Sequence, residues 1–249
     1  MSLVSLINFD DLLPEAVMYL PDCPEQVIKR WLRRAARDFC VDTEAWDYTF
    51  PVIDVTAFQP TYSLNAGENA RVQRITSVRI DGSPQDADKI AYRDGDETLV
   101  FRDKYVPVTT TATIAAYDPT ATYSANDEVK YDGQYYKARA AISVAESWTR
   151  YHWQEITDGM YVKVKLVPRL TATTIPEWMG DRWGIAIAAG AASLLLRMPK
   201  MPWTDLQMAA EREAKYKEGV RAGRMENYLG KLAQTRVFTS NPDRETERG

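Results

Sequence analysis

The chain has 249 residues, which is enough for one or two domains with a substantial hydrophobic core. Hydrophobic residues make up 45% of it and charged residues 27%, a composition that excludes disordered and fibrous proteins. The formal net charge of -4 excludes a general polyanion binder, so any contact with nucleic acid must be local. One histidine, His152, and two cysteines leave little material for a zinc site or a disulfide framework.

The N-terminal segment has the pattern of two helices. Asn8 is a candidate N-cap of a short helix, which Pro14 kinks or divides before Tyr19. Pro24 opens a second helix, in which apolar residues recur at helical spacing to about Trp46. The opposite side of this helix carries a run of cations, which we call the basic face: Lys29, Arg30, Arg33, Arg34 and Arg37. Such a face is either solvated or binds DNA phosphates or an acidic partner surface.

Between residues 48 and 117 the pattern changes to that of an antiparallel sheet. Arg71–Ile80 is rich in β-branched residues and alternates with period two, which predicts a strand. Other strands are expected at 52–55, 98–101 and 109–117. The strand pattern returns at Met160–Val167, which we expect to pair with the earlier sheet.

Pro176 opens a further helix after the sheet. Small residues recur in this helix at every fourth position: Gly180, Gly184, Ala188 and Ala192. Because small side chains allow close approach, this stripe predicts a tightly packed core helix.

The last predicted helix begins at a capping box formed by Thr204 and Gln207 and ends near Gly230. Its apolar stripe is thin and is interrupted by Gly219 and Gly223. This helix is therefore either largely solvated or packed against another copy of the chain. The polar residues 231–249 that follow are expected to be an extended or disordered tail.

The sequence lacks the usual motifs of catalysis. It contains neither a phosphate-binding loop nor a Gly-x-Ser-x-Gly elbow. We expect Cys23 and Cys40 to be buried thiols and His152 to be a hydrogen-bonded structural residue. The prediction is a protein with no catalytic residues, no bound metal and no cofactor, and thus not an enzyme.

Targeting and membrane signals are also missing from the pattern. Residues 1–8 do not read as a secretory signal, so synthesis in a cytoplasm is expected. The longest uncharged apolar run, Trp183–Leu196, is shorter than the roughly 20 residues of a spanning helix. No membrane span is expected.

Both ends of the chain carry a series of short motifs. In chain order they are Phe9–Glu15, Cys23-Pro24, Asp38–Cys40, Leu166–Pro168, Ile175–Trp178, Gly190–Leu195, Met198–Trp203 and Gly219–Arg224. Their order and spacing resemble those of tailed-bacteriophage head-to-tail connector (adaptor) proteins. The resemblance covers about half of the chain.

This resemblance implies an α+β fold in three parts. The segments 1–47 and 171–249 would form a helical bundle, the adaptor core, with an extended C-terminal tail at 231–249. The segments 48–117 and 158–170 would form an inserted antiparallel β domain, which itself carries a small all-β module at 118–157.

The resemblance also implies a function and its partners. Members of this family assemble as homo-oligomeric rings, commonly dodecameric, beneath the portal protein in the neck of the virion. The ring extends the DNA channel to the tail or nozzle protein, and genomic DNA passes through it without sequence-specific contacts during ejection. A C-terminal segment often docks on the portal, and the matching candidates here are Arg236, Phe238 and Arg244.

The aromatic segment 118–157 resembles small chitin-binding-like carbohydrate-binding modules through Tyr117–Val129, Tyr131–Ala138 and Trp153–Ile156. Where sugar binders often carry a tryptophan pair, this chain has Arg139-Ala140-Ala141. The aromatic residues that remain as candidates for stacking on a ligand are Trp148, Tyr151 and Tyr117. Tyr131, Tyr136 and Trp153 are instead expected to form the module core.

Two alternative functions remain open at the level of sequence. The first is a carbohydrate-binding protein, or an accessory part of a glycan hydrolase, in which the helices only support the module. The second is a DNA-binding protein that uses Arg30, Arg33, Arg34 and Arg37 of the basic face.

Overall fold

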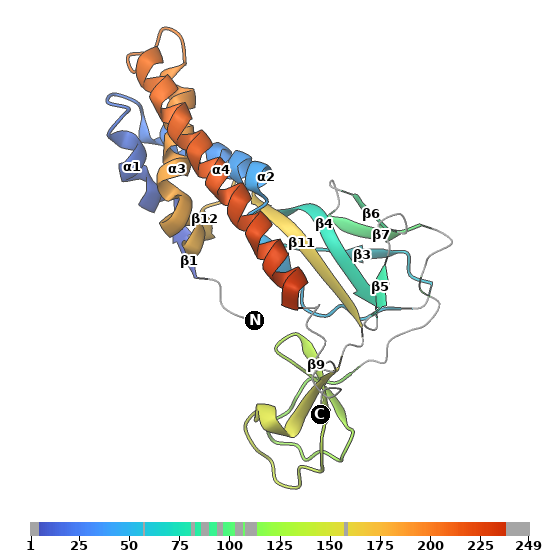
Figure 1. Cartoon of the computed structure of the whole chain (residues 1–249). Coiled ribbons are helices and arrows are strands. Elements are labelled where there is room, and N and C mark those ends of the chain that lie inside the picture. Colours follow the sequence, from blue (N-terminus) through green and yellow to red (C-terminus); the bar gives the residue numbers. More distant parts are fainter. Residues whose placement is uncertain are drawn as a thin grey trace, which may run out of the picture. The chain divides into compact units, whose positions relative to one another are not determined.

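The computed structural model describes residues 5–56, 58–80, 83–85, 90–93, 97–102, 107, 114–156 and 159–237. It combines helices with several antiparallel sheets, so the α+β class predicted from the sequence is confirmed (Figure 1). The chain divides into two compact units. We call them the sheet unit (Met1–Leu3, Asp47–Ala66 and Val72–Lys165) and the helical unit (Val4–Trp46, Gly67–Arg71 and Leu166–Gly249).

The N-terminal part of the helical unit begins with strand β1 (Leu6–Asn8), which pairs antiparallel with β12 (Thr174–Pro176). A short 3-10 helix, Phe9–Leu12, follows, and Asn8 and Asp11 form its capping box. Helix α1 (Leu13–Val17) has Pro14 in its first turn. The short helix that Pro14 divides is therefore present as predicted.

Helix α2 (Glu25–Thr43) starts after Pro24, as predicted, and its apolar stripe is buried. It ends when Glu44 takes a left-handed conformation with φ of 51° and donates its N–H to the Cys40 carbonyl at 2.9 Å. Cys40 is fully buried, and burial raises the pKa of its thiol. Cys23 is half-buried, so the expectation of burial holds fully for Cys40 only.

Helix α3 (Glu177–Leu196) follows Pro176 and is buried along most of its length. The four residues of the predicted small-residue stripe are all buried. A Cβ atom at Gly180 would overlap the Ile7 side chain, and one at Gly190 would lie 2.6 Å from the Tyr216 ring. The predicted tightly packed core helix is therefore confirmed, with Gly180 facing β1 and Gly190, outside the predicted stripe, facing α4.

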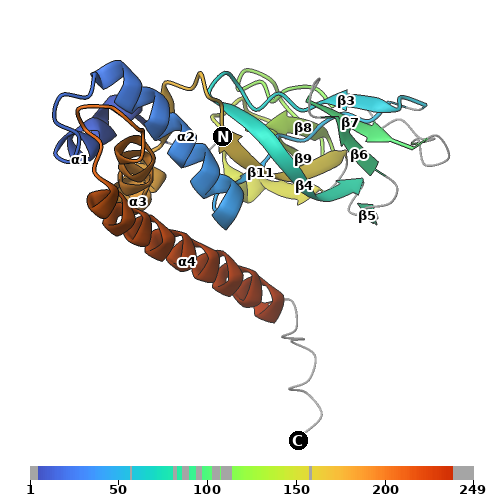
Figure 2. The same cartoon turned by 90° about the horizontal axis from the view of Figure 1, so that it is seen from above.

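Helix α4 (Leu206–Val237) runs along α3 and continues past it (Figures 1 and 2). Its N-cap is Asp205, whose Oδ1 accepts the Met208 N–H at 2.9 Å. The predicted capping box at Thr204 is therefore wrong by one residue, because the Thr204 hydroxyl binds backbone groups of the preceding turn instead.

The end of α4 also differs from the prediction. The helix continues through Gly230 to Val237, so residues 231–237 are helical and not an extended tail. Helix-forming residues such as Lys231, Leu232 and Ala233 outweigh the cost of one glycine, about 1 kcal/mol. Residues 238–249 of the predicted tail lie outside the described residues.

The sheet unit is built around a four-stranded sheet in the order β2-β11-β4-β5. Its strands are β2 (Asp47–Thr49), β11 (Met160–Pro168), β4 (Ala70–Ile80) and β5 (Ser83–Gln85). The two longest are the predicted strands, and they pair with one another as expected. Lys165 on β11 is buried, and its Nζ lies 2.7 Å from Asp47 Oδ2 on the neighbouring β2.

A smaller sheet has the order β3-β7-β6 and consists of Thr61–Ser63, Thr98–Phe101 and Ile90–Arg93. Its strand β7 coincides with the strand predicted at 98–101. The strand predicted at 52–55 is wrong, because only Ile53 forms an isolated bridge, to Met160. Most of the strand predicted at 109–117 lies outside the described residues, and Ala116 forms an isolated bridge to Lys130.

The aromatic segment forms a three-stranded antiparallel sheet, β10-β9-β8. Its strands are Trp153–Ile156, Gln134–Ala138 and Glu128–Tyr131. Asp132 and Gly133 both have positive φ values, of 47° and 75°, which suits a two-residue turn between β8 and β9. We refer to residues 117–156 as the module.

Among the described helices, none combines the length and apolar character needed to cross a membrane.

Candidate functional site

The basic face of α2 is the first candidate site, and the structure divides it. Three of its five cations line an open groove of about 900 Å³, which we call the arginine groove: Arg30, Arg34 and Arg37. Lys29 is instead paired with Asp10, its Nζ lying 3.0 Å from Oδ1. Arg33 is half-buried and its Nε is inaccessible to solvent. The sequence predicts the cations of this helix face but not which of them line the same groove.

The arginine groove also has an apolar lining, formed by Val27, Trp31, Val41, Leu170 and Met198. The Arg34 guanidinium lies 5.0 Å from the centre of the Trp31 ring, a cation–π contact. The only carboxylate among the lining residues is Asp38. Burial raises the pKa of Asp38, and the neighbouring Arg34 and Arg37 lower it. A surface that combines arginines with apolar side chains suits an anionic partner that also has apolar groups.

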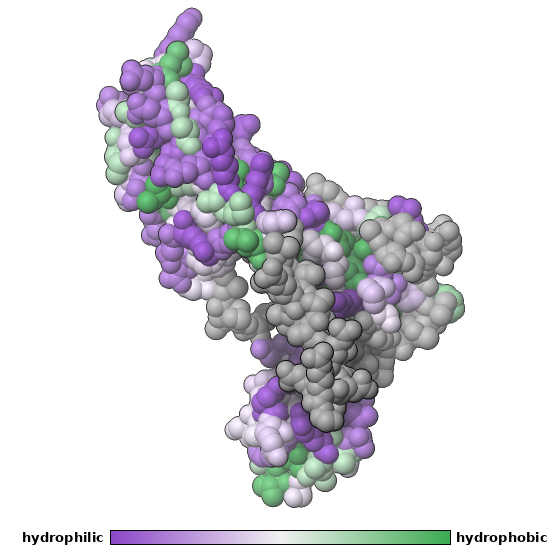
Figure 3. Space-filling view, viewed as in Figure 1, coloured by the Kyte–Doolittle hydropathy of each residue, from purple (hydrophilic) through white to green (hydrophobic). Residues whose placement is uncertain are grey.

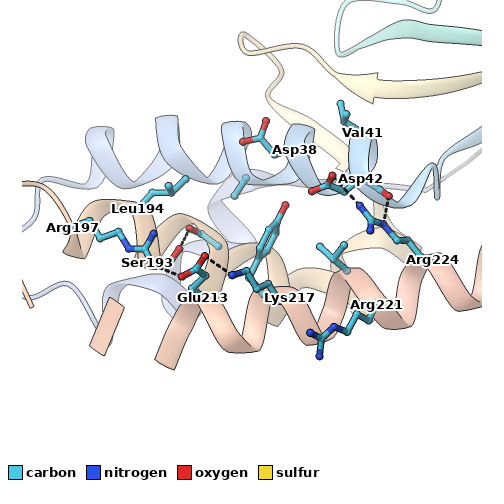
Figure 4. A pocket seen from close by; sticks show the side chains of 14 residues that line it. Asp38, Val41, Asp42, Ser193, Leu194, Arg197, Glu213, Lys217, Arg221 and Arg224 are labelled. Carbon is cyan, nitrogen blue, oxygen red and sulfur yellow. Dashed lines mark hydrogen bonds and ion pairs between the residues drawn. The ribbon is translucent and has the colours of Figure 1, made fainter. Parts of the chain in front are cut away.

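A second concave region lies between α2, α3 and α4, and we call it the interhelical cleft (Figure 4). Its volume is about 580 Å³. Charged side chains cross it: the Arg224 Nε donates to the Asp42 carbonyl at 2.7 Å, and the Arg224 guanidinium lies 3.2 Å from Asp42 Oδ1. Glu213 pairs with both Arg197 and Lys217. These pairs join the three helices.

The electrostatics of the interhelical cleft are those of a structural network. The hydrogen bonds from Lys217 and Arg197 lower the pKa of Glu213. Burial raises the pKa of Tyr216 well above its usual range, and the carboxylates of Asp42 and Asp38 raise it further. Because Glu213 and Asp42 already pair with basic side chains of the cleft, the cleft has the character of a helix-joining contact. The sequence analysis missed this network, since its members lie far apart in the chain.

The C-terminal half of α4 carries exposed apolar side chains. Met225, Tyr228 and Leu229 are 59%, 59% and 55% exposed, and their spacing places them on one side of the helix. We call them the α4 apolar face. The sequence left open whether this helix is solvated or packs on another copy of the chain. The structure shows that its exposed side carries large apolar groups. Exposed apolar side chains that group on one side of a helix are typical of interaction surfaces.

The predicted portal-binding residues follow this face in the chain. Arg236 is the penultimate residue of α4. Phe238 and Arg244 lie outside the described residues.

The candidate stacking residues of the module have different environments. Trp148 stacks nearly parallel on Tyr131, with centroids 3.9 Å apart, and on Trp153 at 5.2 Å. Tyr117 stacks on Tyr123 at 5.5 Å and meets the edges of further rings. Trp148 and Tyr117 are thus both engaged in one aromatic cluster, and both are only half-buried; their role as platforms for a ligand stays a prediction.

The expected module core is confirmed in part. Tyr136 and Trp153 are buried in it, together with Val129, Ala138 and Ile142. Tyr131 is 37% exposed and covers Trp148 from outside the core, so its assignment to the core is wrong.

Tyr151 is the one candidate platform that remains open, since 82% of it is exposed. It borders a hollow of about 510 Å³, the module hollow, which is also lined by Arg139, Glu146 and His152. His152 Nδ1 lies 2.5 Å from Glu146 Oε1, so the predicted hydrogen-bonded histidine is confirmed. The role of Glu146 as its partner was not visible in the sequence.

In the described part of the chain, no group of three or more His, Cys, Asp and Glu side chains could hold a metal ion. No model of a known protein family matches the sequence, and no curated protein matches it either.

Proposed function

We propose that this protein is a non-enzymatic virion structural protein of a tailed bacteriophage, a head-to-tail adaptor. It forms a homo-oligomeric ring under the portal, in the virion neck, and extends the DNA channel to the tail. The proposal joins the family resemblance of the two chain ends to one observation. Helices from both ends pack on one another, because α2 contacts both α3 and α4 within a single unit.

The packing of the two ends is what an adaptor core requires. The motifs that resemble the adaptor family lie at 9–40 and 166–224, and a β region separates them in the chain. If the motifs belonged to unrelated domains, their helices would have separate cores. Instead the buried residues of α2 and α3 face one another, as the contact between Cys40 Sγ and Met179 Sδ at 3.6 Å illustrates. This favours one helical bundle as the adaptor core.

We assign the α4 apolar face and the tail after it to the portal protein. The three side chains of the α4 apolar face are large and exposed, and the predicted anchors Arg236, Phe238 and Arg244 follow them in the chain. An aromatic residue and arginines are the residue types that most often dominate binding energy at interfaces. The helix would then present the tail to the portal.

Cryo-electron microscopy of the assembled particle tests the proposal directly. Density for this chain in a ring between portal and tail is expected, and its absence from the neck would refute the assignment.

Portal binding can be tested in solution with the portal protein of the same virus. We expect Tyr228→Ala, and separately a chain that ends at Val237, to bind the portal at least tenfold more weakly than the full chain. Leu206→Ala is the matched control, because Leu206 is 69% exposed at the opposite end of the same helix. Equal loss in the control, or no loss in either variant, would contradict the assignment.

A second candidate function, carbohydrate binding, is favoured by the module hollow. The exposed ring of Tyr151 lines the same hollow as a hydrogen-bonded carboxylate, that of Glu146. A ring face and a polar group that fixes orientation are the elements a sugar site needs. This reading predicts heat of binding with chitin-type or bacterial surface oligosaccharides in calorimetry, and its loss in Tyr151→Ala. No heat with either glycan class would eliminate it.

A further inference from the structure

The helical unit separates its charges along the chain. All charged residues between Met1 and Ile28 are acidic: Asp10, Asp11, Glu15, Asp22 and Glu25. We call residues 10–25 the acidic knuckle. Asp10 is paired with Lys29, and Asp11 accepts the Asn8 N–H. The remaining three carboxylates are exposed, and within the described part of the chain they have no ion-pair partner.

The acidic knuckle also exposes apolar side chains. Val17 is 40% exposed and Met18 is 61% exposed, although both lie in or beside α1. Figure 3 shows the visible face of the helices as mainly hydrophilic, with scattered hydrophobic residues. A surface that combines carboxylates with two apolar groups is the chemical complement of the arginine groove.

The arginine groove is the cationic counterpart on the same unit. Among the described residues, Arg30 and Arg37 have no ion-pair partner, and Arg34 only meets Asp38 at 4.0 Å. Its rim exposes Val41 and Leu170, which are 45% and 52% exposed. Positive charge and exposed apolar groups thus coincide here, as negative charge and exposed apolar groups do on the knuckle.

We propose that the acidic knuckle of one copy docks in the arginine groove of the next copy. This inference rests on the proposed adaptor function and identifies the contact that closes its ring. The knuckle adjoins the groove at the first turn of α2, where Glu25 precedes the groove residues Gln26 and Val27. From Glu25 the groove extends about 18 Å along the helix axis to Arg37. When the knuckle of each copy binds one neighbour and its groove binds another, the contact is head-to-tail, and its repetition generates a ring or an open filament.

A second copy fits this groove better than DNA does. Val41, Leu170 and Trp31 gain nothing from phosphates, and Asp38 would repel them. The knuckle instead offers apolar side chains for this lining and carboxylates for the arginines. DNA binding by the groove remains a distinguishable outcome of the test below.

Charge reversal tests the contact. The groove variant is Arg34→Glu with Arg37→Glu, and the knuckle variant is Glu15→Lys with Asp22→Lys. Self-association is measured by sedimentation velocity, and ring formation on the portal is followed by native mass spectrometry. We expect each variant alone to associate at least tenfold more weakly than the natural chain. The natural chain should also associate more weakly as salt is raised.

Rescue distinguishes a lost contact from a misfolded variant. A mixture of the two variants restores both kinds of contact, so it should associate again to within a few-fold of the natural chain. The control, Lys215→Glu with Arg221→Glu, changes the charge equally on exposed residues of α4 and should associate normally. Failure of the mixture to associate, or normal association of either variant alone, would overturn the inference. So would failure of the natural chain to associate both free and on the portal.

The test also separates this inference from the function on which it rests. If both charge-reversal variants still form a ring in the virion neck, the adaptor function stands and the proposed contact between knuckle and groove is refuted. If the mixed variants assemble again but the protein is absent from the virion neck, the contact between copies stands and the adaptor function is refuted. If duplex DNA binds the natural chain and not the groove variant while self-association is unchanged, the groove is a DNA site and the inference fails.

Discussion

At the scale of single residues, glycines decide how closely the helices pack. Gly219 and Gly223 interrupt the apolar stripe of α4 in the sequence, but both face neighbouring helices. A Cβ atom at Gly219 would overlap the Ala186 Cβ on α3, and one at Gly223 would lie 2.9 Å from Thr43 Cγ2 on α2. The sequence did not distinguish a weak stripe from a stripe whose packing groups are glycines.

Gly219→Ala should therefore lower the free energy of unfolding, whereas the same substitution at Gly230, also on α4, should raise it. The new methyl group must displace α3, which outweighs the higher helix propensity of alanine, and we expect a loss of about 1–3 kcal/mol in the free energy of unfolding. Gly230 has no neighbouring atom within 4 Å of such a methyl group, so Gly230→Ala should gain up to about 1 kcal/mol. Urea denaturation measures both, and equal effects at the two positions would contradict the packing argument.

Trp148 and Tyr151 give a second contrast at this scale. Trp148→Ala removes a ring that stacks on Tyr131 and Trp153, so we expect the module to lose about 3 kcal/mol of stability. Tyr151 is 82% exposed, and Tyr151→Ala should change stability by less than about 0.5 kcal/mol. Thermal denaturation followed by near-ultraviolet circular dichroism measures both changes. If Trp148→Ala left stability unchanged, the ring would be free to act as a platform after all.

At the scale of elements, apolar periodicity over many residues was sufficient to predict a helix or strand, whereas short signals such as one capping residue were not. Helix α2 and strands β4 and β11 were predictable because their apolar residues repeat over many residues. The strand predicted at 52–55 failed because β propensity does not supply a partner strand. The cap of α4 failed because Thr204 and Asp205 are both good caps, and tertiary contacts of Thr204 decided between them.

The candidate site was predictable in composition but not in arrangement. The cations of the basic face follow from the sequence of one helix. Which of these cations line the groove does not follow from the sequence. Lys29 forms an ion pair with Asp10, which lies on another element, and Leu170 from a distant loop completes the groove lining. Contacts between segments far apart in the chain carry no local signal.

The contribution of the Glu213 ion pairs with Lys217 and Arg197 to stability should decrease in acid. Hydrogen bonds from Lys217 and Arg197 lower the pKa of Glu213 in the folded protein. A carboxylate whose pKa is lower when folded stabilises the protein above its unfolded pKa, near 4.3, and this contribution is lost as the pH falls through the folded value. Glu213→Gln should therefore be less stable than the natural chain at neutral pH, and the difference should shrink below about pH 4. Denaturation from pH 7 to pH 3 measures it, and a constant difference would contradict the assignment.

At the scale of the whole molecule, the two units have their own buried cores, and their stabilities should respond separately. Trp153 is 1% exposed in the module, and Leu32 is completely buried in α2. Trp153→Ala should speed hydrogen exchange of the β8 and β9 amides and leave that of α3 unchanged. Leu32→Ala should speed exchange in α3, which packs on α2, and leave β8 and β9 unchanged. Each truncation is expected to cost about 2–5 kcal/mol within its own unit. Exchange that rises throughout the chain in both variants would mean that the two units unfold as one cooperative body.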